Sequence, residues 1–254
     1  MIFGIEFPPV SHAIEWPDLF GSGPFAVNKV VLMMWGSVLI VALIFLLASR
    51  DHGLVPRGVK NLAEATVDFI REGIVMQTMG ADGLGWTPLF LTLFTFIFVN
   101  NLWGILPIAQ MPVNARMALP LFLALLIWVI FVTVGMVKQG PIKYFTNIMF
   151  PPGVPKPLYV LVSPIELVST IFVRPLSHSV RLFANALAGH LILISFAVIT
   201  AALFTASITL LLWPFSFALL VALTGFELLV AFLQAYIFTI LAGVYIGSSM
   251  HADH

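Results

Sequence analysis

Cysteine is absent from this chain of 254 residues, and charged residues are scarce. The lack of cysteine excludes disulfide bonds and thiolate metal sites. Asp, Glu, Lys and Arg make up only 9% of the chain, whereas soluble domains carry about 25%. The net charge is zero, so there is no electrostatic reason to expect binding to nucleic acid. A glycine-rich phosphate-binding loop is missing too, and we expect the chain to bind no nucleotide.

Hydrophobic residues, by contrast, make up 61% of the chain, which predicts a polytopic membrane protein. A helix that crosses a bilayer needs about 20 consecutive apolar residues. Three segments of this kind are expected to span the membrane, at residues 27–48, 86–106 and 118–137. Two further apolar segments, at residues 164–204 and 211–247, are longer than a perpendicular span. We expect both to be tilted and to pair as an antiparallel hairpin.

Residues 59–79 show a different pattern, since apolar residues at helical spacing alternate there with charged ones. This pattern predicts an amphipathic helix that lies on the membrane surface. The predicted fold class is therefore an all-α polytopic membrane protein, with five membrane-embedded helices and one amphipathic surface helix. Because no soluble segment and no internal repeat is evident, residues 1–254 are expected to form a single membrane domain.

The distribution of Lys and Arg predicts how the chain is oriented, because these residues favour the cytoplasmic side. Residues 50–85 carry four of them and the connector at residues 138–163 carries three, whereas the loop at residues 108–117 carries one. With the basic loops inside, residues 1–26 form an external N-terminal segment and residues 248–254 form a cytoplasmic tail. The first residues lack the basic start of a signal peptide, so we expect no cleaved leader.

Arg181 is the most unusual residue of the long apolar region, because no Lys or Arg follows it in the chain. Arg at the centre of a bilayer costs about 2.5–3.5 kcal/mol on insertion scales, and it cannot escape by losing its proton. We therefore expect the chain to use this charge. Ser177 and Asn185 lie one helical turn on either side of it, and His178 lies three residues before it. Spacing of this kind predicts that the four side chains cluster near one helix face.

His190, Glu227 and Gln234 are further polar residues in the apolar hairpin. In an antiparallel pair of helices, residues at equal height have residue numbers with a constant sum. A single register with its apex near residue 208 places Arg181 beside Gln234 near mid-membrane, and His190 beside Glu227 nearer the outer face. A His–Glu pair in an apolar wall can relay protons, because both groups can be tuned toward neutral pH.

Purely structural roles stay open for each of these residues. A buried His is often a hydrogen-bonded packing residue, and Glu227 would then be the structural partner of His190. Asn and Gln commonly join helices within membranes. Arg174 lies closer to the cytoplasmic end of its segment, so it is expected to extend toward the interface as a structural residue.

Three blocks of the sequence resemble subunit a of the rotary ATP synthases, and together the resemblance covers most of the chain. The first block is residues 174–190, Arg-Pro-Leu-Ser-His-Ser-Val-Arg-Leu-Phe-Ala-Asn-Ala-Leu-Ala-Gly-His. The second is residues 226–238, Phe-Glu-Leu-Leu-Val-Ala-Phe-Leu-Gln-Ala-Tyr-Ile-Phe, and the third is residues 98–107, Phe-Val-Asn-Asn-Leu-Trp-Gly-Ile-Leu-Pro. Arg-Leu-x-x-Asn followed by Gly and His or Glu is highly specific to this family.

The resemblance implies that Arg181 is the essential arginine that faces a ring of c subunits, with Asn185 one turn along and Gln234 as its neighbour. It also implies that His190 and Glu227 form the acid–histidine pair of the family. Here the His comes first and the Glu second, whereas some bacterial members have the reverse order.

Further positions are implied by the same resemblance. Asn101 matches a polar position of the outer half-channel, and Glu166 resembles a residue near the cytoplasmic half-channel, with Ser169 close to it in sequence. Some members have an acidic residue where Gly104 stands, so no proton role is expected at that position.

The implied function is that of a proton-translocating stator, with two offset half-channels that Arg181 separates. Its partners would be the ring of c subunits, the peripheral-stalk b subunits and the remainder of the ATP synthase complex, within a bacterial plasma membrane. No catalytic site, cofactor or metal is expected in this chain, and its residues do not decide between H⁺ and Na⁺.

Two other classes of protein predict different sequence features. A self-contained channel or secondary transporter predicts inverted repeats or paired segments broken by Gly and Pro, and neither is found in the sequence. The stator of another ion-driven motor would lack the Arg-Leu-x-x-Asn block.

Overall fold

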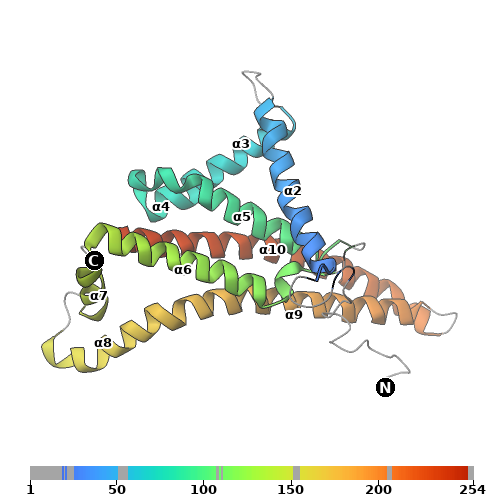
Figure 1. Ribbon diagram of the computed structural model, residues 1–254. Coiled ribbons are helices and arrows are strands. Elements are labelled where there is room, and N and C mark those ends of the chain that lie inside the picture. Colours follow the sequence, from blue (N-terminus) through green and yellow to red (C-terminus); the bar gives the residue numbers. More distant parts are fainter. Residues whose placement is uncertain are drawn as a thin grey trace. The chain divides into compact units, whose positions relative to one another are not determined.

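The computed structural model describes residues 19, 21, 26–50, 57–106, 109, 111–150, 155–204 and 208–250. Within them the chain is built of helices, so the predicted all-α fold class is confirmed (Figure 1). Most of the expected external segment at residues 1–26 lies outside the described residues, as do residues 251–254 of the expected tail.

Five helical stretches are long and apolar enough to cross a membrane, as the sequence predicted. The chain is therefore an integral membrane protein. The stretches are α2 (Lys29–Arg50), the 3₁₀ helix η2 (Gly80–Trp86) with α5 (Thr87–Leu102), α6 (Ala118–Gln139), the continuous stretch Tyr159–Leu203, and α10 (Trp213–Met250). They are predominantly apolar along their length, which is the composition expected of helices surrounded by lipid or by other helices.

The segment that was expected to lie on the surface is helical and has two distinct faces. It consists of α3 (Val59–Ile70), a π-helical turn η1 (Arg71–Val75) and α4 (Met76–Thr78), and it ends at Gly80, whose φ of 67° suits glycine. Ile70 and Ile74 are completely buried, whereas Glu64 is exposed and forms an ion pair of 3.8 Å with Lys60.

The connector between α6 and the long hairpin contains a helix that the sequence interpretation did not foresee. Gly140 ends α6 with a φ of 84°, and Pro141 then begins α7 (Pro141–Met149) at the first helical position. A short 3₁₀ helix η4 (Lys156–Leu158) follows. The described part of the connector thus contains two helices.

The two long stretches pair as an antiparallel hairpin. The first consists of α8 (Tyr159–Val168), a π-helical turn η5 (Ser169–Val173) and α9 (Arg174–Leu203), and a 3₁₀ helix η6 (Ile208–Leu211) precedes α10. The Thr200 and Ser216 hydroxyls lie 2.7 Å apart, which fixes the register near the turn. The apex expected near residue 208 agrees with this register, and residues 205–207 of the turn lie outside the described part of the chain.

The two halves of α10 are packed very differently. None of residues 213–230 is buried, whereas residues 231–250 contain a regular row of buried positions. Ala235, Ala242 and Ile246 in this second half are completely buried, and Phe238 is 2% exposed. The first half of the helix is therefore covered by little of its own chain.

The chain divides into two compact units, and we describe each by itself. The first consists of Met1–Ala42, Phe96–Arg116 and Phe183–Ala235, and the second consists of Leu43–Thr95, Met117–Leu182 and Tyr236–His254. The expectation of a single membrane domain stays a prediction.

A polar cluster lies in the core of the first unit. Ser37 of α2 is completely buried, and its hydroxyl donates to Asn100 Oδ1 over 3.0 Å. Trp103 Nε1 donates in turn to Ser37 Oγ over 2.8 Å. These bonds attach α2 to the end of α5, because buried polar groups must find partners in an apolar environment.

The core of the second unit is mainly aromatic and aliphatic. Phe90 is completely buried, and Phe131 and Phe238 are each 2% exposed. Gly135 of α6 allows a very close approach of the Tyr144 ring, since a methyl group at this position would collide with that ring. A large ring thus fills the space beside a residue that has no side chain, which is the close packing found in other protein interiors.

Candidate functional site

Arg181 lies on α9 and its side chain is exposed. Ser177, one turn earlier on the same helix, is exposed as well. Among the residues that the structure describes, no carboxylate lies within ion-pair distance of Arg181. The permanent charge is therefore presented on the outer surface of the helix, where the bilayer or another protein has to meet it.

His178 occupies a different environment from Arg181, although both were expected near one face. It is 4% exposed, and its ring centroid lies 3.8 Å from that of Phe238 on α10. A spacing of three residues corresponds to about 300° of helical rotation, so the two side chains are about 60° apart. In this helix that angle is enough to turn His178 toward α10 while Arg181 faces outward.

Arg174 has a partner within the chain. Its guanidinium carbon lies 5.4 Å from the centroid of the Tyr245 ring, which is within the range of a cation–π contact. This contact is consistent with a structural role for Arg174.

Asn185 and Gln234 connect α9 to α10. Asn185 Nδ2 donates to Gln234 Oε1 over 2.6 Å. Gln234 is 4% exposed, and its Nε2 is buried without a hydrogen-bond partner among the described residues. A buried amide donor of this kind calls for a water molecule or a group from another chain. Gln234 thus joins α9 one turn beyond Arg181, at the asparagine of the Arg-Leu-x-x-Asn motif.

Glu227 packs directly against the backbone of α9. A Cβ added to Gly189 would collide with both carboxylate oxygens of Glu227, so the acid occupies the space that the missing side chain leaves. Glu227 itself is half-buried. Glycine is therefore required at position 189 for the close approach of the Glu227 carboxylate to α9. His190 is the next residue of that helix.

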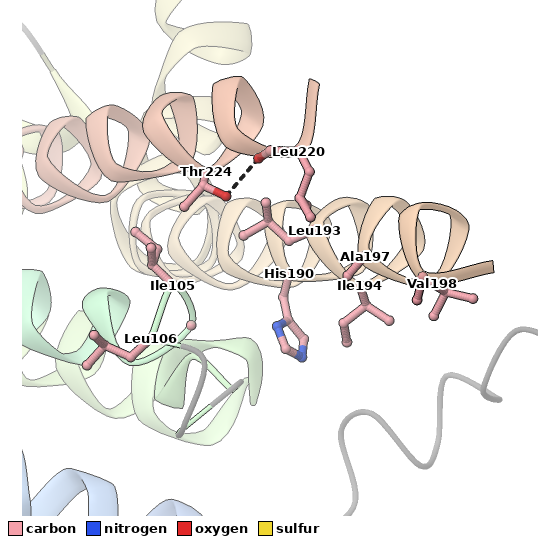
Figure 2. Close-up of a pocket in the computed structure, with 11 residues that line it drawn as sticks. Ile105, Leu106, His190, Leu193, Ile194, Ala197, Val198, Leu220 and Thr224 are labelled. Atoms are coloured by element: carbon pink, nitrogen blue, oxygen red, sulfur yellow. Dashed lines mark hydrogen bonds between the residues drawn. The ribbon is translucent and has the colours of Figure 1, made fainter. Parts of the chain in front are cut away.

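His190 is 2% exposed and lines a pocket of about 540 Å³ in the first unit. Figure 2 shows its imidazole extending from α9 into this pocket, with Ile105 and Leu106 on one side and with Leu220 and Thr224 of α10 nearby. The Thr224 hydroxyl donates to the Leu220 carbonyl over 2.8 Å, so its hydrogen is used within its own helix. His190 is the one titratable residue among those that line the pocket.

Asn101 takes part in a buried chain of amides. Asn114 Nδ2 donates to Asn101 Oδ1 over 2.7 Å, and Asn101 Nδ2 lies 3.4 Å from the Ala231 carbonyl. Ala231 follows Glu227 by one turn of α10, so this chain of amides reaches α10 close to the acid. Asn114 is completely buried. The role of Asn114 in this chain of amides was not predicted, because nothing in the sequence of residues 108–117 distinguishes a buried asparagine from an exposed one.

Glu166 and Ser169 are both half-buried, at the end of α8 and at the start of η5 respectively. In the described part of the chain, no recorded hydrogen bond joins either of them to another candidate residue. Thr170 is a neighbour that sequence reasoning missed. It is 3% exposed, and its carbonyl accepts a hydrogen bond from Trp128 Nε1 over 3.2 Å. The π-helical turn that begins at Ser169 is a local distortion of the kind often found at functional sites.

The arrangement offers groups that bind and release protons, together with a fixed cation. His and a half-buried Glu are suited to proton exchange, and the arginine supplies a charge that does not titrate. Among the described residues, no three His, Asp or Glu side chains lie close enough together to hold a metal ion.

Comparison with known proteins identifies close similarity over nearly the whole chain. The family model described as ATP synthase A chain matches residues 31–247. The ATP synthase subunit a of Rhodococcus erythropolis is 40% identical over 251 residues, which are 95% of this chain and 91% of the relative. That of Frankia alni is 39% identical over 99% of this chain and 88% of its own length. That of a Methylobacterium species is 41% identical over 98% of this chain and 99% of its own length.

Proposed function

Because this chain belongs to the ATP synthase subunit a family, we propose that it is the stator that guides protons to and from a ring of c subunits. Membership of the family makes it a subunit of the proton-translocating membrane sector of ATP synthase. The finer proposal is that the chain forms two offset half-channels, which open to opposite sides of the membrane and are separated by Arg181.

The exposed position of Arg181 is the observation that carries this proposal. Its side chain faces outward from α9, and no carboxylate of the described chain lies within ion-pair distance. A charge of this kind in a membrane needs a counter-charge, and a carboxylate on a passing c subunit would provide one transiently. The cation favours the ionised form of that carboxylate, so each c subunit would release its proton before it passes Arg181. Because Arg keeps its proton, it would also block direct transfer between the two half-channels.

We infer that the outer half-channel follows the polar groups of the first unit. The amide chain of Asn114 and Asn101 reaches α10 one turn from Glu227. Glu227 lies against Gly189, and the neighbouring His190 points into the pocket of Figure 2. An acid, an imidazole and buried amides within one compact unit supply the groups that a proton path needs in an apolar environment.

We assign the inner half-channel to the region of Glu166 and Ser169. Both are half-buried, and both lie near the π-helical turn η5. The support for this assignment is an intramembrane carboxylate close to a local break in helix geometry.

Partners and location follow from the same proposal. The c ring would contact the exposed face of α9 that carries Ser177, Arg181 and Asn185, and the peripheral-stalk b subunits would hold the chain stationary. The N-terminus would lie outside and the C-terminus in the cytoplasm of a bacterium, because the basic loops then lie inside. Protons would be driven by about 2.3 kcal/mol per 100 mV of membrane potential.

Arg181→Ala provides the direct test. We expect ATP synthesis driven by an imposed proton gradient to fall to background in membrane vesicles, while the complex still assembles at normal abundance. Arg71→Ala is the matched control, since it removes another exposed arginine, which lies in the surface segment outside the proposed half-channels, and it should leave most of the activity. Near-normal synthesis by an assembled Arg181→Ala complex would refute the proposed separation of the half-channels.

A further inference from the structure

A small pocket in the second unit lies at one end of three helices. Its volume is about 180 Å³, and it is lined by the last two turns of α6, by Trp86 at the end of η2 and by Met250 at the end of α10. Pockets that hold a whole small molecule usually enclose about 300–1,000 Å³. The space is therefore suited to part of a longer apolar chain and too small for most complete ligands.

Lys138 gives this apolar pocket a single cationic side chain. It lines the pocket together with Val134 and Val137, and it is exposed. Because α6 is apolar up to this point, Lys138 marks the level at which the helix leaves the hydrocarbon. Trp86 lies in the same pocket, and Trp is enriched at the boundary between lipid tails and headgroups.

The surrounding sequence is positively charged over a long distance. No Asp or Glu occurs from Gly83 to Ile165, whereas this stretch contains Lys138, Lys143 and Lys156 near the end of α6 and in the connector. Lys138 and Lys143 are exposed, and neither forms an ion pair with any residue in the described part of the chain. This stretch of the chain therefore lacks acidic residues to neutralise its lysines.

Helix α7 holds Lys143 in place instead of leaving it on a loose loop. Tyr144 is 4% exposed and packs against Gly135 of α6. Burial raises the pKa of the Tyr144 hydroxyl, so this hydroxyl stays protonated. Ile142, on the other hand, is 82% exposed. A fixed helix with an exposed apolar residue beside a lysine is typical of a helix that lies at a membrane surface.

Two further hydrogen bonds fix this corner of the molecule. Asn147 Nδ2 of α7 donates to Gln139 Oε1 over 3.0 Å, and Gln139 Nε2 donates to the Ser249 carbonyl of α10 over 3.0 Å. The ends of α6 and α10 are thus joined to α7 in one corner, at which Lys138 and Lys143 are presented.

We propose that this corner is a binding site for one anionic phospholipid, with its headgroup phosphate at Lys138 and Lys143 and one acyl chain in the pocket beside Trp86 and Val134. Cations next to a membrane-spanning helix attract anionic headgroups, and an apolar slot next to them favours a lipid over a free phosphate ion. The proposal concerns neither half-channel, so it does not depend on the path of the protons.

The test uses the full chain in its native assembly, purified in mild detergent and stripped of lipid by washing. Phosphatidylglycerol and phosphatidylcholine with the same acyl chains are then added in equal amounts, and the bound lipid is counted by native mass spectrometry. We expect one retained phosphatidylglycerol in excess over phosphatidylcholine. Lys138→Gln should lower its affinity about fivefold, since one cation near an anionic surface contributes about that factor. The double variant Lys138→Gln/Lys143→Gln should abolish the preference.

Two variants separate a defined site from general surface charge. Val134→Trp fills the pocket and keeps both lysines, and it should remove the retained lipid. Lys60→Gln makes the same charge change on α3, far along the sequence from the corner, and should leave binding unchanged. Equal retention of the two lipids by the unmodified chain would overturn the proposal. The proposal would also be overturned if the double variant retained the lipid fully, or if inorganic phosphate alone displaced it. Cross-linking of Lys138 to another subunit in place of lipid would overturn it as well.

Discussion

Arg181 and Glu227 are both ionisable residues in long apolar helices, but the chain surrounds them differently. Arg181 is exposed on α9, and within the described chain no carboxylate lies at ion-pair distance. Glu227 is half-buried against Gly189, the residue that precedes buried His190 in the sequence, and it lies one turn of α10 from a chain of buried amides. The difference indicates two tasks. Under the proposed function, a charge that must meet a moving partner would be left uncovered, and a group on a fixed proton path would pack against its own chain.

The largest effect is expected from Arg181→Lys, which keeps a cation on the exposed side but gives it a titratable proton. Lys shifts its pKa readily when desolvated, whereas Arg does not, and each pKa unit changes the ratio of charged to neutral forms tenfold. We expect gradient-driven ATP synthesis to fall about tenfold or more, with an increased passive proton leak through the membrane sector. The measurement is ATP synthesis together with the decay of a pH gradient in the same vesicles. Normal synthesis without a leak would show that any cation suffices at this position.

Glu227→Gln tests the enclosed side of the comparison, because it keeps the shape of the side chain and removes its proton exchange. We expect proton uptake through the membrane sector to slow by about tenfold or more, and its pH dependence to flatten. Uptake would be followed by a pH-sensitive dye in vesicles stripped of the catalytic sector. Glu64→Gln on α3 is the control for loss of an acid elsewhere and should be neutral. Unchanged rate and pH dependence would exclude Glu227 from the path.

Gly189→Ala tests the packing between Glu227 and α9 without changing any polar group. The added methyl group would collide with the carboxylate, and overpacking of this kind costs about 1–3 kcal/mol. We expect synthesis to fall several-fold and the midpoint of thermal unfolding to decrease.

Gly225→Ala is the matched control for that substitution. It lies two residues from Glu227 on α10, and a Cβ added there meets nothing within 4 Å. It should therefore be neutral or slightly stabilising, since alanine favours helix more than glycine does. If both variants behave alike, the close approach of Glu227 to Gly189 has no functional consequence.

The smallest effect is expected from Thr200→Val, near the turn of the hairpin. This change removes the Thr200–Ser216 hydroxyl contact of 2.7 Å and keeps the shape of the side chain. Hydrogen bonds between membrane helices contribute about 0.6 kcal/mol on average. A double-mutant cycle with Ser216→Ala, read from unfolding in detergent, should give a coupling energy of about this size, while proton transport stays unchanged. A loss of transport would instead indicate that the hydroxyl pair belongs to the proton path.

The candidate residues could be found from the sequence because ionisable and amide side chains are rare in apolar helices. Arg181, His190 and Glu227 stood out on composition alone, and the constant sum of residue numbers in an antiparallel pair predicted the register of α9 and α10. The sequence motif around Arg181 then pointed to one family. The five apolar stretches were equally clear, since each is long enough to cross a bilayer.

Other features could not be derived from spacing. The burial of His178 depends on the position of Phe238, and a rotation of 60° about α9 leaves either environment open. Asn114 joins Asn101 through a loop whose path has no periodic signal. The π-helical turns η1 and η5 each insert a wide turn that shifts every later side chain around its helix, and no residue pattern marks them in advance. The pairing of His190 with Glu227 stays a prediction, while the structure shows that Glu227 packs against Gly189.

The uneven packing of α10 has a consequence for the life of the chain in the cell. None of residues 213–230 is fully buried within the described part of their own chain, although they follow an ordinary helical path. Local opening is easiest where few contacts must be broken, so this half of the helix should be the first to yield when neighbouring subunits are missing. A newly inserted chain would then be recognised by membrane proteases at this segment until assembly covers it. Degradation of unassembled copies would keep their number matched to that of their partners.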